Sequence, residues 1–429
     1  MIVLKFSSIE TIFNSKPYFK YLLNALLVVS LMFGTLLSPV TGTAQAGDRE
    51  QAKRIHDRIA GVPPSADVLD AMEADIAADT EANNAITAAF TAMENTAFYD
   101  VTLKNLAAPW TNEAMSSFVP LNDYSATVIG LVKHDEDFRT LLYGDVLYVG
   151  ADSLGLSNDY STTDNDHYEE LEASGESLQD NLVAVQQTIL NGLPLQATAG
   201  ILTSRAAAQA FFSGGTNRAM FRFTMLNHLC NDMEQVNDTT RAPDRIRQDV
   251  SRSPGGDSRI FLNSCVGCHS GMDPMAQAFA YYDFEYDADA DPDGLFGQMV
   301  YNTSGTIDPD TGDRVQGKYR INATSFEHGF VTLDERWDNY WRAGQNSIIG
   351  WDANLDGSGN GPKSMGQELA HSEAFASCQV QKVFKNVCLR DPVDQTDRNQ
   401  ISSLVTSFKN SNYNLKNVFA ESAVYCMGP

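Results

Sequence analysis

Basic residues are scarce in this sequence. It contains 30 lysines and arginines against 55 aspartates and glutamates in 429 residues, which gives a formal net charge of −25. A surface this acidic repels the phosphates of nucleic acids and of anionic membranes, so we expect neither as a partner. A basic partner protein is compatible with this charge, and so is an acidic surface that serves only solubility.

Long apolar runs are also scarce. One run lies at residues 21–37, and no other stretch is long and apolar enough to span a bilayer. Three lysines precede the run and Ala44-Gln45-Ala46 follows it, which is typical of a secretory signal peptide with its cleavage site. An uncleaved membrane anchor is the alternative. We predict that residues 1–46 are a signal peptide, that no membrane span is left after cleavage, and that the protein is periplasmic or extracellular.

Cysteine and histidine are rare too, with six and seven residues, yet three of them form the run Cys265-Val266-Gly267-Cys268-His269. Two thiols three positions apart lie one helical turn apart, where each can form a thioether with a haem vinyl group, and the next imidazole can bind the iron. A zinc site would need a second Cys or His pair nearby, and a thioredoxin-like motif would need a preceding strand, whereas residues 251–256 indicate a loop. The run therefore predicts one covalent haem c, with a disulfide as the main alternative. Covalent haem attachment also belongs outside the cytoplasm, in agreement with the predicted signal peptide.

Helical periodicity prevails in the rest of the chain, and no repeat recurs at a fixed period. Ser65 is a candidate N-cap, Asp273-Pro274 is expected to begin a helix, and residues 283–363 are expected to form long acidic loops. The fold class is therefore mostly α, with a helical N-terminal region at 47–198 and a cytochrome c-like haem domain with a C-terminal helical module at 199–429. The predicted helices are 49–60, 66–93, 124–148, 171–190, 206–212, 218–229, 366–387 and 397–408.

A family resemblance is carried by G-I-L-T-S at residues 200–204, by the helix expected at 218–230, and by C-V-G-C-H-S-G-M-D-P-M-A-Q-A-F-A-Y-Y-D at residues 265–283. These segments resemble the cytochrome-linked domains of planctomycete-type cytochrome c proteins. Residues 54–65 are similar to the N-terminal helical module of those proteins, and residues 368–378 and 407–419 to their C-terminal module. The resemblance is weak over residues 94–199, and Val387-Cys388-Leu389-Arg390 replaces the usual Gly-Arg. It implies one haem and a domain order rather than a reaction.

The ligand opposite His269 would set the redox behaviour of the iron. Met272 and Met275 are too close to the motif to reach the other face of the ring. The residues far enough along the chain are Met299, Met365, His328 and His371. Met365 precedes the expected C-terminal helix, an arrangement similar to that of small soluble cytochromes c, so we prefer it as distal ligand. Met299, His371 and an open site remain alternatives.

Four cysteines lie outside the motif: Cys230, Cys378, Cys388 and Cys426. An even number in an exported chain suggests two disulfides, for which three connectivities exist. On one helix Cys378 and Cys388 would lie about 15 Å apart, beyond the limit of about 7 Å between bridged Cα atoms. We therefore prefer Cys388 with Cys426 and Cys230 with Cys378.

Two acidic segments have the spacing of cation ligands. Asp352, Asn354 and Asp356 precede a glycine, and four aspartates alternate between Asp287 and Asp293. Alternate oxygen ligands followed by glycine resemble the first half of a calcium loop, but Lys363 stands where an EF-hand has its bidentate glutamate. Asp352, Asn354 and Asp356 are therefore candidate calcium ligands, with a solvated turn as the alternative.

These observations favour a monohaem cytochrome that transfers electrons to and from redox partner proteins. The sequence has no second C-x-x-C-H, which a dihaem peroxidase would need, and no constellation of nucleophile or paired carboxylates. A haem-dependent oxidoreductase or peroxidase-like enzyme is the alternative, because a simple carrier needs only about a hundred residues. A binding module in which haem is structural is a third class.

Overall fold

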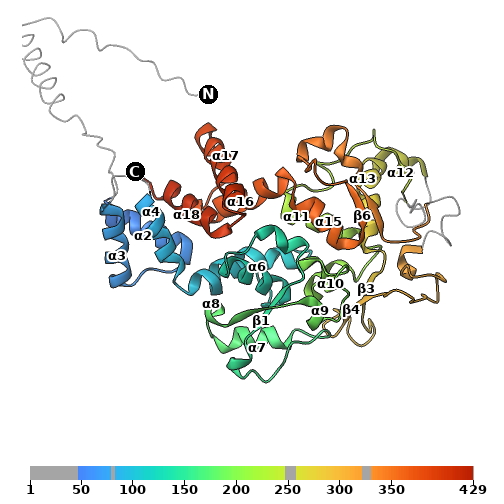
Figure 1. The fold of residues 1–429 in the computed structure, drawn as a ribbon, viewed down its shortest axis with the longest axis horizontal. Coiled ribbons are helices and arrows are strands. Elements are labelled where there is room, and N and C mark those ends of the chain that lie inside the picture. Colours follow the sequence, from blue (N-terminus) through green and yellow to red (C-terminus); the bar gives the residue numbers. More distant parts are fainter. Residues whose placement is uncertain (1–46, 79–82, 247–257, 321–329, 429) are drawn as a thin grey trace, which may run out of the picture. The chain divides into compact units, whose positions relative to one another are not determined.

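The computed structural model describes residues 47–78, 83–246, 258–320 and 330–428. The predicted signal peptide, residues 1–46, lies outside the described residues. The structure is 54% helix and 6% strand, which confirms the mostly α class (Figure 1). No helix in the part of the chain that the structure describes is long and apolar enough to cross a membrane.

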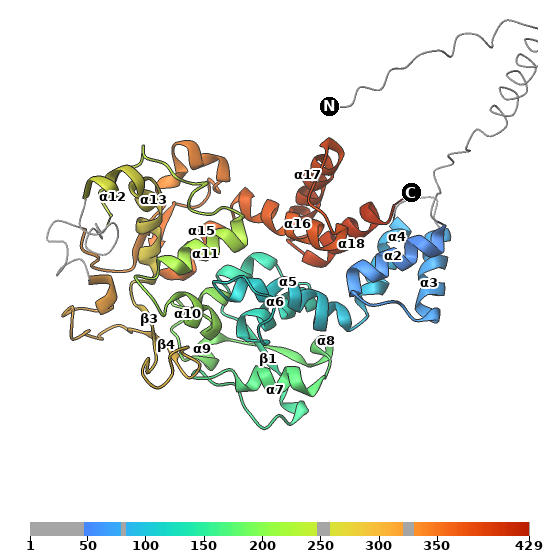
Figure 2. The same ribbon diagram turned by 180° about the vertical axis from the view of Figure 1, so that it is seen from behind.

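The N-terminal helices α2 (Asp48–Ala60), α3 (Ala66–Ala77) and α4 (Asn83–Met93) pack against one another, and α18 (Leu415–Cys426) packs against α2 and α4 (Figures 1 and 2). Gly61 ends α2 with a φ of 73°, which glycine adopts without strain. Ser65 caps α3 as predicted, since its side chain accepts a hydrogen bond of 3.3 Å from Val68 N. The single helix predicted at 66–93 was wrong, because α3 ends at Ala77 and α4 begins at Asn83.

Two predicted helices in the middle of the chain were wrong in part. The segment predicted as a helix at 124–148 contains α6 (Asp123–Lys133) and the start of strand β1 (Leu147–Gly150). The segment predicted at 171–190 contains strand β2 (Leu182–Val185), which pairs antiparallel with β1. All four residues of β1 are buried. Short apolar runs of this kind fit a buried strand as well as a helix, so the periodicity alone did not separate them.

The remaining elements up to residue 211 are the π-helix η1 (Phe98–Leu103), helices α5 (Lys104–Ala107), α7 (Asp166–Ser174), α8 (Leu178–Asn181), α9 (Gln187–Leu190) and α10 (Arg205–Phe211), and 3₁₀ helices η2 (Ala108–Thr111), η3 (Phe138–Leu142), η4 (Asp152–Leu154) and η5 (Gly200–Thr203). Helix α10 matches the predicted helix at 206–212 to within one residue at each end. Asp123 accepts hydrogen bonds from the backbone nitrogens of Arg205 and Ala206 at 2.6 and 3.0 Å, which joins the start of α10 to α6.

From α11 onward the elements are helices α11 (Arg218–Leu229), α12 (Ser258–Ser264), α13 (Val266–Ala276), α15 (Gly361–Ala370), α16 (Glu373–Cys388) and α17 (Gln395–Asn410), strands β3 (Tyr282–Glu285), β4 (Gln298–Tyr301), β5 (Arg336–Asp338) and β6 (Ser358–Asn360), and 3₁₀ helices η6 (Gln277–Phe279), η7 (Gly317–Arg320), η8 (Tyr340–Arg342) and η9 (Gln345–Ile349). Strand β3 pairs with β4, and β5 with β6, both antiparallel. The expected loop region 283–363 therefore contains parts of two small hairpins. Asp273-Pro274 does not begin a helix but lies within α13, which starts at the C-x-x-C-H run.

Two disulfides confirm the preferred pairing. Cys230 and Cys378 have their Cα atoms 5.3 Å apart, and Cys388 and Cys426 have theirs 5.5 Å apart. The first bond ties the end of α11 to α16, and the second ties the end of α16 to the end of α18. The buried apolar residues form one continuous core that extends from Ala52 to Ala423.

Glu335 is a half-buried acid that directly precedes β5. Its Oε2 atom is buried without a hydrogen-bond partner among the described residues. Arg314 is the positive charge that acts on Glu335, and it lies 4.0 Å from the centre of the Tyr281 ring and donates a 2.6 Å hydrogen bond to Tyr301. Burial raises the pKa of Glu335 from 4.5 to about 7, although Arg314 opposes the change.

We expect Glu335 to make the protein less stable as the pH rises from about 4.5 to about 7. The folded state holds the proton in this range and the unfolded state does not, so the free energy of unfolding falls by up to about 3 kcal/mol at 1.36 kcal/mol per pKa unit. Glu335→Gln cannot ionise, so its stability relative to the wild type should increase by that amount over the same range. Urea unfolding at several pH values measures this difference. The exposed Glu285→Gln is the control, and an equal pH slope in all three proteins would contradict the expectation.

Candidate haem-binding site

The C-x-x-C-H run lies at the start of α13. Cys265 is the residue before the helix, and His269 N donates a 3.2 Å hydrogen bond to Cys265 O, which closes the first turn. Cys265, Cys268 and His269 therefore lie within one turn, as the spacing predicted. Helix α12 ends immediately before the run, and α11 packs against α13.

The two cysteines of the run bear free thiols, whereas the other four cysteines are paired. The disulfide expected as the alternative for Cys265 and Cys268 is thus not formed. Both residues are partly exposed. The Cys268 thiol donates to Met233 O at 3.2 Å, and burial raises its pKa. Two unpaired and accessible thiols beside an imidazole are the donor set that a covalent haem requires.

His269 is held by a carboxylate. Its Nδ1 atom lies 3.0 Å from Oδ1 of Asp273, one turn further along α13. An ionised carboxylate only accepts hydrogen bonds, so this contact assigns the proton to Nδ1. The side chain of His269 is 19% exposed and that of Asp273 only 1%. The contact fixes the ring orientation, and Nε2 is the ring nitrogen opposite to it.

Asp273 is itself paired with Arg218 of α11. Nε and Nη2 of Arg218 each lie 2.7 Å from a different oxygen of the carboxylate. Burial would by itself raise the pKa of Asp273, but the electrostatic interactions and hydrogen bonds with Arg218 and His269 hold it well below its usual range. The carboxylate therefore stays ionised although it is buried.

Two glycines let α13 approach its neighbours closely. A Cβ atom on Gly267 would lie 1.7 Å from Oδ1 of Asn237, and one on Gly271 would lie 2.0 Å from Nε1 of Trp341. Asp238 N also donates a 2.9 Å hydrogen bond to Gly267 O. The backbone of the motif is thus fixed on the face of α13 that bears these glycines. Glycines one turn apart on a helix are a signal of such a close approach, but this role was not predicted from the sequence.

Of the candidate distal ligands, Met365 and His371 belong to α15, the latter as its C-cap, Met299 lies in β4, and His328 lies outside the described residues. Met365 is fully buried on α15, which packs against β5 and η6, two elements that α13 also contacts. Met299 lies in β4, opposite Phe284. His371 ends α15, where its Nδ1 lies 2.8 Å from Gln367 O. Met365 as distal ligand stays a prediction.

The predicted calcium ligands make local hydrogen bonds. Asp352 accepts hydrogen bonds of 2.9 Å from the backbone and the side chain of Asn354. In the earlier acidic loop, Asp291 accepts from the backbone nitrogens of Leu295 and Phe296 at 2.9 and 2.7 Å. Over the described ranges, no group of three or more His, Cys, Asp or Glu side chains could hold a metal ion. Calcium at Asp352, Asn354 and Asp356 stays a prediction.

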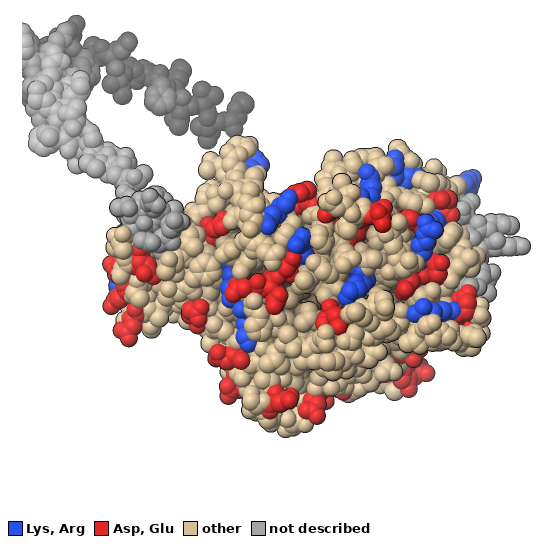
Figure 3. All heavy atoms as spheres, viewed as in Figure 1, with Lys and Arg blue, Asp and Glu red and all other residues tan. Residues whose placement is uncertain are grey.

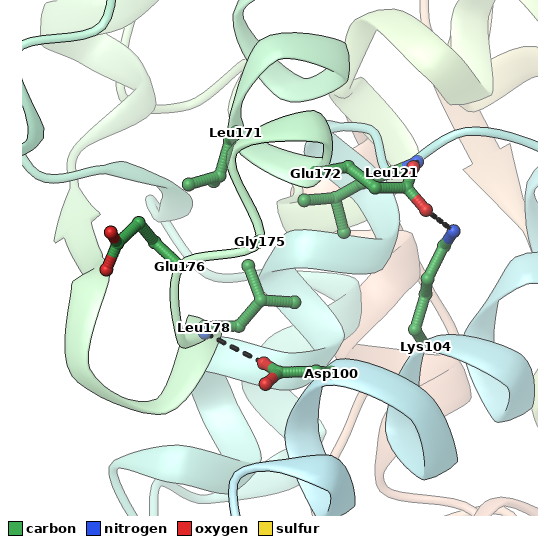
Figure 4. A pocket seen from close by; sticks show the side chains of 8 residues that line it. All are labelled: Asp100, Lys104, Leu121, Leu171, Glu172, Gly175, Glu176 and Leu178. Carbon is green, nitrogen blue, oxygen red and sulfur yellow. Dashed lines mark hydrogen bonds and ion pairs between the residues drawn. The ribbon is translucent and has the colours of Figure 1, made fainter.

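Neither of two pockets elsewhere in the structure includes a residue of the motif. The first is lined by Asp100, Lys104, Leu121, Leu171, Glu172, Gly175, Glu176 and Leu178 (Figure 4). In it Lys104 forms an ion pair with Glu172, and Asp100 accepts a 2.8 Å hydrogen bond from Leu178 N. The second is lined by Arg139, Gly350, Trp351, Asp352, Ala353, His371, Glu373, Lys409 and Tyr413. Its cations are paired as well, Arg139 with Asp137 and Lys409 with Glu373.

The charged side chains are mixed over much of the face in Figure 3. Acidic side chains gather over α3 and α7, whereas Lys and Arg alternate with Asp and Glu over α15 and α16. A large basic patch, of the kind that nucleic acid requires, is absent from the described residues on this face.

No family model, no curated protein and no solved structure matches this chain. The resemblance to planctomycete-type cytochrome c proteins therefore remains an expectation from the sequence.

Proposed function

We propose that this protein is an exported cytochrome of the c type that carries one covalent haem and transfers electrons between redox partner proteins outside the cytoplasm. The observation that carries the proposal is the first turn of α13, which bears two free, partly exposed thiols and an imidazole held by a buried carboxylate. This set fits the needs of haem c, because thiols form the covalent bonds and an oriented imidazole binds the iron.

Each residue of the turn has a distinct role in the proposal. Cys265 and Cys268 would hold the haem through thioethers, and His269 would be the proximal ligand through Nε2. Asp273 would keep the imidazole in one orientation. The haem itself would supply a reversible one-electron couple at its iron. Met365 is the preferred distal ligand, which would raise the potential relative to a second histidine.

A haem-dependent oxidoreductase or peroxidase-like enzyme is the second candidate. One observation favours it: a carboxylate bonded to a ligating histidine makes the imidazole a stronger donor, which favours the ferric state. An open site opposite His269 would then allow a small molecule to bind. We rank electron transfer first because the sequence has no second C-x-x-C-H and no constellation of a nucleophile or paired carboxylates.

The test is to express the full chain in a host that attaches c-type haem and to analyse the purified protein. Mass spectrometry and acid-acetone extraction report covalent haem, and absorption and magnetic spectra report the ligands. A low-spin, six-coordinate haem whose spectrum does not change with carbon monoxide or peroxide supports the electron carrier. A high-spin ferric haem that turns over peroxide supports the enzyme. A folded protein from the same host that carries no covalent porphyrin would refute both.

A further inference from the structure

Asp273 and Arg218 form a chain of charged contacts that ends on His269. On α13, His269 and Asp273 are four residues apart and thus lie on the same face of the helix. One oxygen of Asp273 accepts from His269 at 3.0 Å, and both oxygens accept from Arg218 at 2.7 Å. We propose that Asp273, held by Arg218, is a positioning residue that strengthens the donation of His269 to the iron and thereby lowers the midpoint potential. The inference rests on the proposed haem function.

The contact with Arg218 gives the carboxylate a fixed place. Two parallel hydrogen bonds from the guanidinium fix the plane of the carboxylate, which a single hydrogen bond cannot do. Arg218 is in turn fixed at the first turn of α11, because the preceding Asn217 is buried and donates hydrogen bonds of 3.0 and 2.8 Å to Phe279 O and Tyr282 O. Two packed helices, α11 and α13, therefore hold the carboxylate of Asp273 against His269.

The charge on Asp273 distinguishes this arrangement from a neutral one. A backbone carbonyl would also accept the Nδ1 proton and orient the ring, but a full negative charge in a buried place increases the basicity of the imidazole more. A more basic imidazole stabilises ferric over ferrous iron. Arg218 offsets part of the charge, so the effect on the iron is smaller than that of an unpaired carboxylate.

The decisive variant is Asp273→Asn in the haem-loaded full chain. The amide keeps the shape and can still accept from His269 Nδ1, but it removes the charge. We expect covalent haem to be retained and the ferric–ferrous equilibrium to shift about tenfold towards ferrous, a rise of about 60 mV in midpoint potential for one electron. A redox titration measures the shift. A retained haem with an unchanged potential would overturn the inference and leave the proposed function intact.

Asp397→Asn is the matched control. Asp397 is also a buried carboxylate, 2% exposed and paired with two nitrogens of Arg390. This pair joins α17 to the segment between α16 and α17, away from α13. Its loss should lower stability without changing the potential. An equal change of potential in both variants would show that the effect is structural and would overturn the inference.

A second measurement covers the case in which Asp273→Asn fails to fold. The ¹⁵N resonance of cyanide bound to the ferric wild-type protein reports the donor strength of the ligand on the other side of the iron. We expect a ¹⁵N chemical shift like that of haem proteins in which a carboxylate accepts a hydrogen bond from the proximal imidazole. A value typical of a backbone carbonyl partner would overturn the inference. A wild-type chain without haem would instead refute the proposed function.

Discussion

The double variant Cys265→Ser/Cys268→Ser is expected to lose all covalently bound haem. Serine keeps the size of each side chain but cannot form a thioether, and the two thiols are the only free ones among the described residues. The protein should still fold, since both residues are partly exposed and neither takes part in a disulfide. Mass spectrometry should show the chain without the mass of one haem, and haem staining of a denaturing gel should be negative.

Met365→Leu is the control for this variant. It replaces the preferred distal ligand with an apolar side chain of similar volume, so the core is little disturbed. We expect this protein to keep the full haem mass and to change only its spectrum and potential. If the serine double variant retained covalent haem, the attachment residues would be wrong. If Met365→Leu had the spectrum of the wild type, the assignment of Met365 as distal ligand would be wrong, and Met299, His371 or an open site would take its place.

The site could be predicted from the sequence only as far as its local part. Spacing alone places Cys265, Cys268 and His269 on one turn, because a helix brings residues three and four apart to one side. The partner of His269 was missed, since Asp273 was assigned to the start of a helix. The contact that makes Asp273 important comes from Arg218, 55 residues earlier. Such a pair depends on how α11 packs on α13, which no local pattern specifies.

For the fold as well, local features could be predicted from the sequence, whereas contacts between distant segments could not. Helices with clear end signals were predicted well, such as α2, which ends at Gly61, and α11, which was predicted as residues 218–229. The strands were missed because each has only three or four residues and acquires its partner from a distant segment. Leu147 of β1, for example, pairs with Val185 of β2. Excluding Cys378 with Cys388, a pair that a straight helix keeps apart, left two connectivities, of which the preferred one is observed. Helix α16 does contain both of these cysteines.

Removing the Cys230–Cys378 disulfide is expected to lower the free energy of unfolding by about 5 kcal/mol. This bond joins residues 148 positions apart, whereas the Cys388–Cys426 bond joins residues 38 positions apart. Because a longer closed loop removes more entropy from the unfolded chain, the second bond should contribute only about 4 kcal/mol. The first bond also connects α11, the helix that carries Arg218, to α16, so its loss should loosen the support of the C-x-x-C-H run as well.

The two alanine double variants, Cys230→Ala/Cys378→Ala and Cys388→Ala/Cys426→Ala, test this order by urea unfolding. Each variant removes one sulfur from α16 and one from the end of another helix, so the losses of packing are similar and the loop length is the main difference. Wild-type protein treated with a reductant should be less stable than either variant, since it lacks both bonds. A larger loss from the Cys388 pair would contradict the argument from loop entropy. It would show instead that the Cys388–Cys426 bond stabilises the protein mainly by holding α18 in place against α2 and α4.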